Sequence, residues 1–190
     1  MPVSFITQTE QQKRTHSLSQ NPPTQPPLKK KNSFPPSSYA AFTLHLQTNT
    51  IGPIITAQAL LATPTLIPIK TLIFISSDSG STQRFRAEED GFAVYAASKA
   101  ALNQALRHLA AELERKGSLT KVMALHPGEV ETEMAAQELG WEVPGQMSVE
   151  ESVGRCIGTI EEKAEGASGT FWTWEGEVSG FGRVLVWLRD

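Results

Sequence analysis

Tyr95 and Lys99 are the two side chains whose types and spacing most directly suggest chemistry. They stand four residues apart in a segment, 95–113, that is rich in Ala and Leu and holds no Gly or Pro, which predicts a helix of about five turns. Side chains four apart lie on one helix face, so a phenol stands beside an ammonium. A nearby cation lowers a tyrosine pKa from about 10 towards working pH, which suits a proton donor or acceptor. The alternative is an exposed Tyr and a solvated Lys at a helix start.

The remainder of this helix carries a regular apolar stripe. Four leucines recur at steps of four, three and four residues: Leu102, Leu106, Leu109 and Leu113. Such spacing places them on one face, and Gly117 is a typical stop after the last turn.

Three short apolar runs have the composition of strands buried in a parallel sheet. They are 71–76 (TLIFIS), 121–125 (KVMAL) and 171–174 (FWTW). A helix is predicted from Tyr39 onwards, bent near Gly52-Pro53. Another begins at the capping box of Ser148 and Glu151, with an apolar face made by Val149, Val153, Ile157 and Ile160. Strands that alternate with helices predict an α/β fold, a doubly wound parallel sheet covered on both faces.

The candidate residues gather at one edge of this predicted sheet. Ser77 follows the first strand, Pro127-Gly128 follow the second, and Tyr95 opens the helix between them. Ligands of open parallel sheets bind at the carboxyl ends of the strands. Three positions far apart in the sequence are therefore expected to meet there.

Charge and composition exclude several classes of function. Residues 1–40 carry about +4 charges, so the remainder of this chain of net charge −3 carries about −7, which argues against nucleic acid as a partner. Residues 1–38 are dominated by Gln, Ser, Thr and Pro and are expected to be a disordered tail. The domain is expected to span 39–177, and 178–190 form an extension without a structural prediction.

Cysteine usage and hydropathy set the expected compartment. Cys156 is the single cysteine, so no disulfide can form within the chain and the reducing cytoplasm is the expected location. The segment 51–69 is long enough to cross a bilayer, but Pro53, Pro64 and Pro68 interrupt it. We therefore expect a buried helix followed by a loop, and no membrane span.

Alternating acidic residues follow the second strand. Glu129, Glu131 and Glu133 lie close to His126, which raises the question of a metal cluster. Metal sites need converging ligands, and alternate side chains of an extended segment share a face only where nothing bends. A solvated loop without a metal is the expected structure.

In this arrangement the sequence resembles the short-chain dehydrogenase/reductase family, in its carbonyl-reductase-like branch. The similarity runs in unbroken order over about 40–175. It is carried by NTIG at 49–52, ISS at 75–77, YAASK at 95–99, HPGEVETEM at 126–134 and SGTF at 168–171. A YxxxK motif alone is weak, whereas the ordered set in matching strand and helix context is strong.

The resemblance implies a role for each matched residue. Tyr95 is the expected acid/base, Lys99 lowers its pKa and holds the nicotinamide ribose, and Ser77 polarises the substrate carbonyl. Ser81 is a second candidate for that serine. Asn49 is expected to order a water next to Lys99. Pro127, Gly128, Val130 and Thr132 are expected at the nicotinamide, with the last two at its carboxamide, and NAD or NADP supplies the hydride.

One feature of the family is missing from the sequence. Its first half opens with a strand, a glycine-rich TGxxxGxG turn and a helix that receives the pyrophosphate, and no such motif occurs here. The fold is therefore expected to be a partial, Rossmann-like sheet, with strand 71–76 left as an apolar edge. Weak or no dinucleotide binding is expected, and the segment that selects NAD or NADP is absent.

Two functions follow from these expectations. The first is an oxidoreductase that interconverts a small-molecule carbonyl and alcohol. The second is a non-catalytic family member that packs against a partner subunit. The resemblance implies a dimer contact through helices 40–62 and 95–116, and the leucine stripe fits that use.

Overall fold

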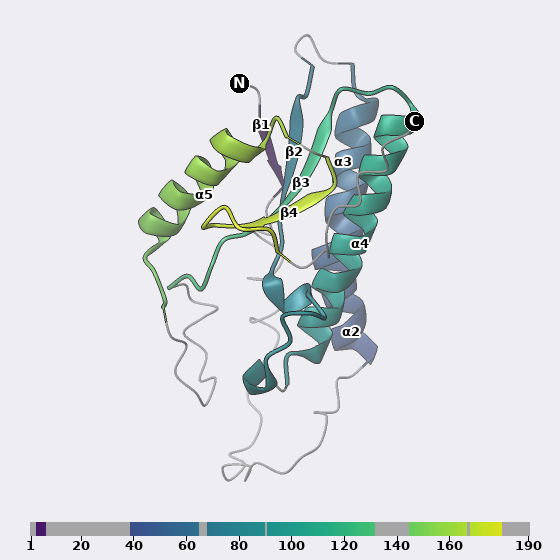
Figure 1. Cartoon of the computed structure of the whole chain (residues 1–190). Helices are drawn as coiled ribbons and strands as arrows, with labels where there is room; N and C mark the ends of the chain where they lie inside the picture. Colours follow the sequence, from purple (N-terminus) through teal and green to yellow (C-terminus); the bar gives the residue numbers. More distant parts are fainter. Residues whose placement is uncertain are drawn as a thin grey trace, which may run out of the picture.

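The computed structural model describes residues 3–6, 39–64, 68–89, 91–131, 145–166 and 168–179. A four-stranded parallel sheet in the order β1-β2-β3-β4 forms its centre. The strands are β1 (Val3–Ile6), β2 (Thr71–Ile75), β3 (Lys121–His126) and β4 (Thr170–Thr173). Three α-helices lie on one side of the sheet, α2 (Tyr39–Leu46), α3 (Gly52–Ala62) and α4 (Ala93–Arg115), and α5 (Val149–Lys163) lies on the other (Figure 1). The predicted α/β class and the parallel sheet covered on both faces are confirmed.

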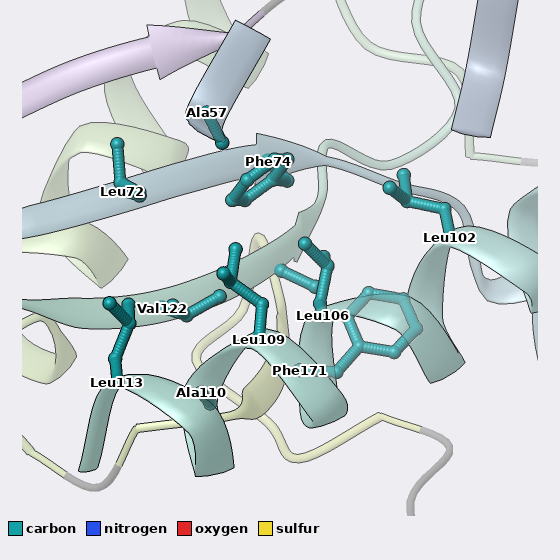
Figure 2. Close-up of a cluster of buried hydrophobic side chains, with 11 residues drawn as sticks. Ala57, Leu72, Phe74, Leu102, Leu106, Leu109, Ala110, Leu113, Val122 and Phe171 are labelled. Carbon is teal, nitrogen blue, oxygen red and sulfur yellow. The ribbon is translucent and has the colours of Figure 1, made fainter. Parts of the chain in front are cut away.

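The leucine stripe of α4 forms the larger half of the core. Figure 2 shows its leucines directed towards alternate residues of the sheet, and the members of this cluster include Leu102, Leu106, Leu109, Leu113, Leu72, Phe74, Val122, Ala124 and Phe171. A fully buried leucine contributes about 1.5–3 kcal/mol by leaving water. The stripe is therefore a core face, and its expected use in a dimer contact is wrong because the sheet already covers it.

The opposite face of the sheet packs on α5 through a smaller cluster. Ile73, Met123 and Leu125 meet Cys156 and Ile160 there. The predicted apolar face of α5 is wrong for three of its four members, because Val149, Val153 and Ile157 are exposed. Small polar side chains occupy the inward positions instead, and they hydrogen-bond to the loops at the strand ends. Ser152 donates to the Pro127 carbonyl at 2.8 Å, and Thr159 donates to the Trp174 carbonyl at 3.0 Å.

The strand β1 lies within the segment that was expected to be disordered. It pairs in parallel with β2, with Val3 opposite Thr71 and Ile6 opposite Phe74. The sequence VSFI has the β-branched and aromatic residues that favour strands. The pairing also supplies hydrogen-bond partners to backbone groups of β2. The expectation that 71–76 would be a bare sheet edge is therefore wrong, and the rest of the 1–38 segment lies outside the described residues.

Helix α4 ends as its sequence predicts. Gly117 has a φ of +71°, and the amide of Ser118 donates to the Leu113 carbonyl at 2.9 Å, which closes the last turn. Helix α5 begins with the predicted cap, because the Ser148 hydroxyl accepts from the Glu151 amide at 3.1 Å. Within the described ranges no helix combines the length and the apolar character that crossing a membrane requires.

Candidate active site

The turn after β2 brings Ser77 close to the first turns of α4. Ser77 has an extended backbone, and its hydroxyl accepts from the Ser79 amide at 3.2 Å, which starts the short 3-10 helix η2 (Asp78–Gly80). A Cβ at Gly80 would lie 2.7 Å from the Lys99 backbone carbon, so η2 packs against α4 at a distance that only glycine allows. Ser81 is also buried, but its hydroxyl accepts from the Arg84 amide at 3.3 Å. Both hydroxyls therefore accept from a backbone amide, and the side-chain interaction with Tyr95 distinguishes Ser77.

Tyr95 and Lys99 occupy successive turns at the start of α4. The Lys99 Nζ lies 5.7 Å from the centre of the Tyr95 ring and donates to the Ile75 carbonyl at 3.1 Å. Lys99 is 1% exposed, so its ammonium is held between the helix and the end of β2. The Ser77 side chain hydrogen-bonds with Tyr95, and this bond favours the phenolate. The structure thus brings together the three residues that the sequence placed at one edge.

The pKa of Tyr95 moves in the direction opposite to the expected one. Burial raises the pKa of Tyr95 to about 12; the Ser77 hydrogen bond opposes this rise, and the carboxylates of Glu129, Asp78 and Glu89 add to it. Burial likewise lowers the pKa of Lys99 to about 8. The expected lowering of the Tyr95 pKa by Lys99 is therefore wrong, because loss of water around the phenol outweighs the nearby amine. At neutral pH the tyrosine is a neutral hydroxyl.

Asn49 lies in a π-helical turn that packs against α4. Between α2 and α3 the chain forms a π-helical segment, Gln47–Ile51, directly before Gly52-Pro53, where the sequence predicted a bend. Asn49 is 1% exposed, and its amide donates to the Ser98 hydroxyl at 2.9 Å. That hydroxyl donates in turn to the Tyr95 carbonyl at 2.7 Å. Asn49 is thus joined to the turn of α4 that carries Tyr95 and Lys99.

The loop after β3 contributes the remaining predicted residues. Gly128 has a φ of +84°, and a Cβ there would lie 2.6 Å from Met147 and 2.7 Å from the Trp174 ring, so the position requires glycine. Pro127 is fixed through its carbonyl by Ser152, and Val130 pairs with Met147 in an isolated parallel bridge. Thr132 lies outside the described residues.

A cluster of charged residues beside Ser77 was identified only in part from the sequence, where His126 and Glu129 were considered together. Asp78, His126 and Glu129 offer ligand atoms within 4.8 Å of one another. The Arg86 guanidinium contacts two of them, Asp78 at 3.2 Å and Glu129 at 3.5 Å, so a cation already lies among the carboxylates. No sequence pattern placed Asp78 or Arg86 beside His126 and Glu129, because the two pairs lie in segments distant along the chain.

Comparison with known proteins decides the family. The family model described as short chain dehydrogenase matches residues 28–142, more than half of the chain. The chain belongs to this family. A curated relative of this short-chain dehydrogenase, an uncharacterized oxidoreductase of Schizosaccharomyces pombe, is 31% identical over 148 residues, which cover 72% of this chain and 57% of the relative. One from Saccharomyces cerevisiae is 31% identical over 145 residues, 72% of this chain and 55% of the relative.

Solved structures give the same family likeness. The NADPH-bound carbonyl reductase from chicken fatty liver superposes with a TM-score of 0.67 at 29% identity, over 81% of this short-chain dehydrogenase and 62% of that chain. Carbonyl reductase Sniffer of Drosophila melanogaster superposes with a TM-score of 0.62 at 28% identity, over 81% of this chain and 63% of that chain. The chain therefore spans somewhat more than half the length of the proteins it matches.

Proposed function

We propose that this short-chain dehydrogenase interconverts a carbonyl and an alcohol, with Tyr95 as the acid/base and NAD or NADP as the cofactor. The observation that carries the proposal is the meeting of Ser77, Tyr95 and Lys99 where β2 ends and α4 begins. The similar chicken enzyme is a carbonyl reductase bound to NADPH, and this supports the same reaction class and a nicotinamide cofactor here.

The protonation state of Tyr95 favours the reductive direction. With a pKa of about 12, Tyr95 holds its proton at neutral pH and can give it to the oxygen of a carbonyl that is being reduced. Ser77 can donate a second hydrogen bond to that oxygen and so stabilise the negative charge that develops on it. Oxidation of an alcohol needs the phenolate, so it requires higher pH.

The residues at this position fit the nicotinamide end of a dinucleotide. An ammonium has three N–H donors, and among the described residues Lys99 uses the Ile75 carbonyl as its hydrogen-bond acceptor. Its other donors suit the ribose hydroxyls, Val130 suits the carboxamide, and Asn49 suits a water next to Lys99. Thr132 is proposed for the carboxamide from the family resemblance alone, since it lies outside the described residues. A bound nicotinamide would supply the hydride.

The second candidate function is a non-catalytic subunit, and it has its own supporting observation. Several apolar side chains of α2, α3 and the segment between them are exposed: Phe42, Leu44, Ile51 and Ile55. Exposed apolar surface of this kind is typical of a site that meets another chain. We propose that this face packs against the same face of a second copy. We also propose a cytoplasmic location, because Cys156 is buried and unpaired.

Cofactor binding separates the two candidates. We expect the 190-residue chain to bind NADPH with a dissociation constant weaker than micromolar, because the sequence holds no glycine-rich pyrophosphate motif. Saturation-transfer NMR at millimolar NADPH should show stronger transfer to the nicotinamide protons than to the adenine protons. Absence of transfer to both rings would leave the non-catalytic subunit as the function. The Lys99→Met variant should lose the nicotinamide signal, whereas Lys116→Met should keep it.

A further inference from the structure

One arginine connects the three segments around the candidate active site. Arg86 stands in the loop before α4, and its guanidinium reaches Asp78 in η2 at 3.2 Å and Glu129 after β3 at 3.5 Å. It also pairs with Glu89 in the 3-10 helix η3 (Ala87–Glu89). A single planar group with five N–H donors therefore ties the ends of two neighbouring strands to the loop that leads into α4.

The tied segments carry the residues proposed for chemistry. Asp78 directly follows Ser77, and η2 rests on the backbone of Lys99 without space for a Cβ at Gly80. A displacement of η2 would therefore move the Ser77 hydroxyl relative to Tyr95. The charged loop 82–91 has no other assigned purpose in the proposed function.

The carboxylates that surround Tyr95 are the same ones that contact Arg86. Three carboxylates, those of Asp78, Glu89 and Glu129, disfavour the phenolate of Tyr95. His126 also faces Asp78 at 3.5 Å, but burial lowers the pKa of His126, so at neutral pH it contributes little positive charge. Arg84 on the same loop pairs with Glu177 at 3.6 Å instead. Among the described residues, Arg86 is therefore the cation in contact with all three carboxylates.

We propose that Arg86 is a positioning residue for the acid/base group: its guanidinium fixes Ser77 against Tyr95 and balances the carboxylates around them. The proposal rests on the proposed function for its meaning in catalysis. Its geometric part can be tested without cofactor or turnover. Arg86 touches neither reacting group, so its effect is expected through Ser77 and through charge.

Because the chain holds few tyrosines, the ring of Tyr95 can be followed by NMR as a single signal. Tyrosine occurs only at positions 39 and 95, so the Tyr39→Phe background with carbon-13-labelled tyrosine gives one ring signal. The protonation of His126 can be followed in the same samples through its ring C–H signal, assigned with His126→Gln. The variants are Arg86→Met, Arg86→Lys and the matched Arg84→Met, which removes a neighbouring arginine with a different carboxylate partner.

Each variant has a distinct expected result. In Arg86→Met the Tyr95 signal shifts, and the pKa of His126 rises, because a nearby cation is lost while Asp78 remains. Arg84→Met leaves the Tyr95 signal unchanged and raises the pKa of His126 less. Arg86→Lys keeps the charge and therefore most of the His126 pKa. It still shifts the Tyr95 signal, because an ammonium cannot bridge three carboxylates as a guanidinium does.

Activity gives the catalytic part of the test. Where reductase turnover is measurable, kcat falls about tenfold in Arg86→Met and stays within about twofold in Arg84→Met. An unshifted Tyr95 signal in both Arg86 variants, or an equal shift in Arg84→Met, overturns the proposal. If Arg86→Met does not fold, the Tyr95 ring signal of Arg86→Lys alone decides whether Arg86 positions the acid/base group. An absence of turnover in every sample would count against the proposed function, whereas the NMR readings would still decide the role of Arg86.

Discussion

At the scale of single residues, burial controls the chemistry of the candidate site more than neighbouring charge does. Tyr95 and Lys99 both move towards their neutral forms, the first with a pKa of about 12 and the second with a pKa of about 8. A neutral phenol beside Ser77 is equipped to give a proton, and a half-protonated amine near pH 8 makes the site sensitive to mildly basic conditions. The short spacing in sequence predicted the pair of residues but not the direction of these shifts, because the spacing says nothing about water.

The pKa of Lys99 predicts a rise of stability with pH. Below pH 8 Lys99 is protonated in both the folded and the unfolded state, so burial of its charge lowers the free energy of unfolding by the full amount. Between about pH 8 and the ordinary lysine value of 10.5, the unfolded state binds more protons, so the free energy of unfolding rises with pH. The expected slope is about 1 kcal/mol per pH unit, measured by urea unfolding between pH 8 and 10.

Comparison of two lysine variants isolates this effect. Lys99→Met should remove the rise, whereas Lys116→Met, which alters an exposed lysine paired with Glu112, should keep it. The half-buried Tyr95 acts in the opposite sense only above pH 10, since its folded pKa lies above the unfolded value of about 10. Parallel slopes for the wild type and Lys99→Met between pH 8 and 10 would show that Lys99 does not titrate as described.

At the scale of elements, α4 connects the core to the chemistry. Its leucine stripe fixes the helix against β2 and β3, and this contact sets where Tyr95 and Lys99 stand relative to the strand ends. The π-helical segment between α2 and α3 performs a related task, since it directs Asn49 to Ser98. The site is therefore built on rigid elements, and loops complete it.

Leu106 offers a direct test of this packing. The side chain is 1% exposed in the cluster between α4 and the sheet, so Leu106→Ala is expected to lower the free energy of unfolding by about 2–5 kcal/mol. Leu119 is 90% exposed in the loop after α4, and Leu119→Ala should change the free energy of unfolding by less than about 0.5 kcal/mol. If Leu106→Ala and Leu119→Ala lowered the free energy of unfolding equally, the packing of α4 on the sheet would not be the core contact described here.

Patterns within one element were predictable from the sequence, whereas contacts between distant elements were not. The strands around β2, β3 and β4, the leucine stripe of α4 and the cap at Ser148 each follow from local periodicity or local hydrogen bonding. The inward face of α5 could not be predicted, because Ser152 and Thr159 face inward to donate hydrogen bonds to carbonyls of other segments. The pairing of β1 with β2 and the reach of Arg86 depend in the same way on chain positions that no local pattern specifies.

At the scale of the whole molecule, two helical surfaces within the described part of the chain each carry several exposed apolar side chains. One lies on α2, α3 and the segment between them, and the other is the outward face of α5 with Val149, Val153 and Ile157. The leucine stripe is not available to a partner, so the proposed contact with a second copy depends on the first surface. Ile51 and Ile55 lie four residues apart on this surface, and both are about half exposed.

A charge at Ile55 tests the proposed contact. Ile55→Glu buries a carboxylate in the contact, so the dimer should dissociate more than tenfold more readily in sedimentation equilibrium. Leu119→Glu introduces the same charge at an exposed position away from this surface and should leave the sedimentation behaviour unchanged. A dimer that tolerates Ile55→Glu would assign the contact to another surface.

The proposed role of Tyr95 as the group that gives the proton is tested most directly by comparing the two tyrosines of the chain. Carbonyl-dependent oxidation of NADPH is measured at saturating cofactor for the wild type, Tyr95→Phe and Tyr39→Phe, the last altering a tyrosine that is 88% exposed. We predict that kcat falls at least about a hundredfold in Tyr95→Phe, and that Tyr39→Phe stays within about twofold of the wild type. Turnover that persists at the wild-type rate in Tyr95→Phe would contradict the account.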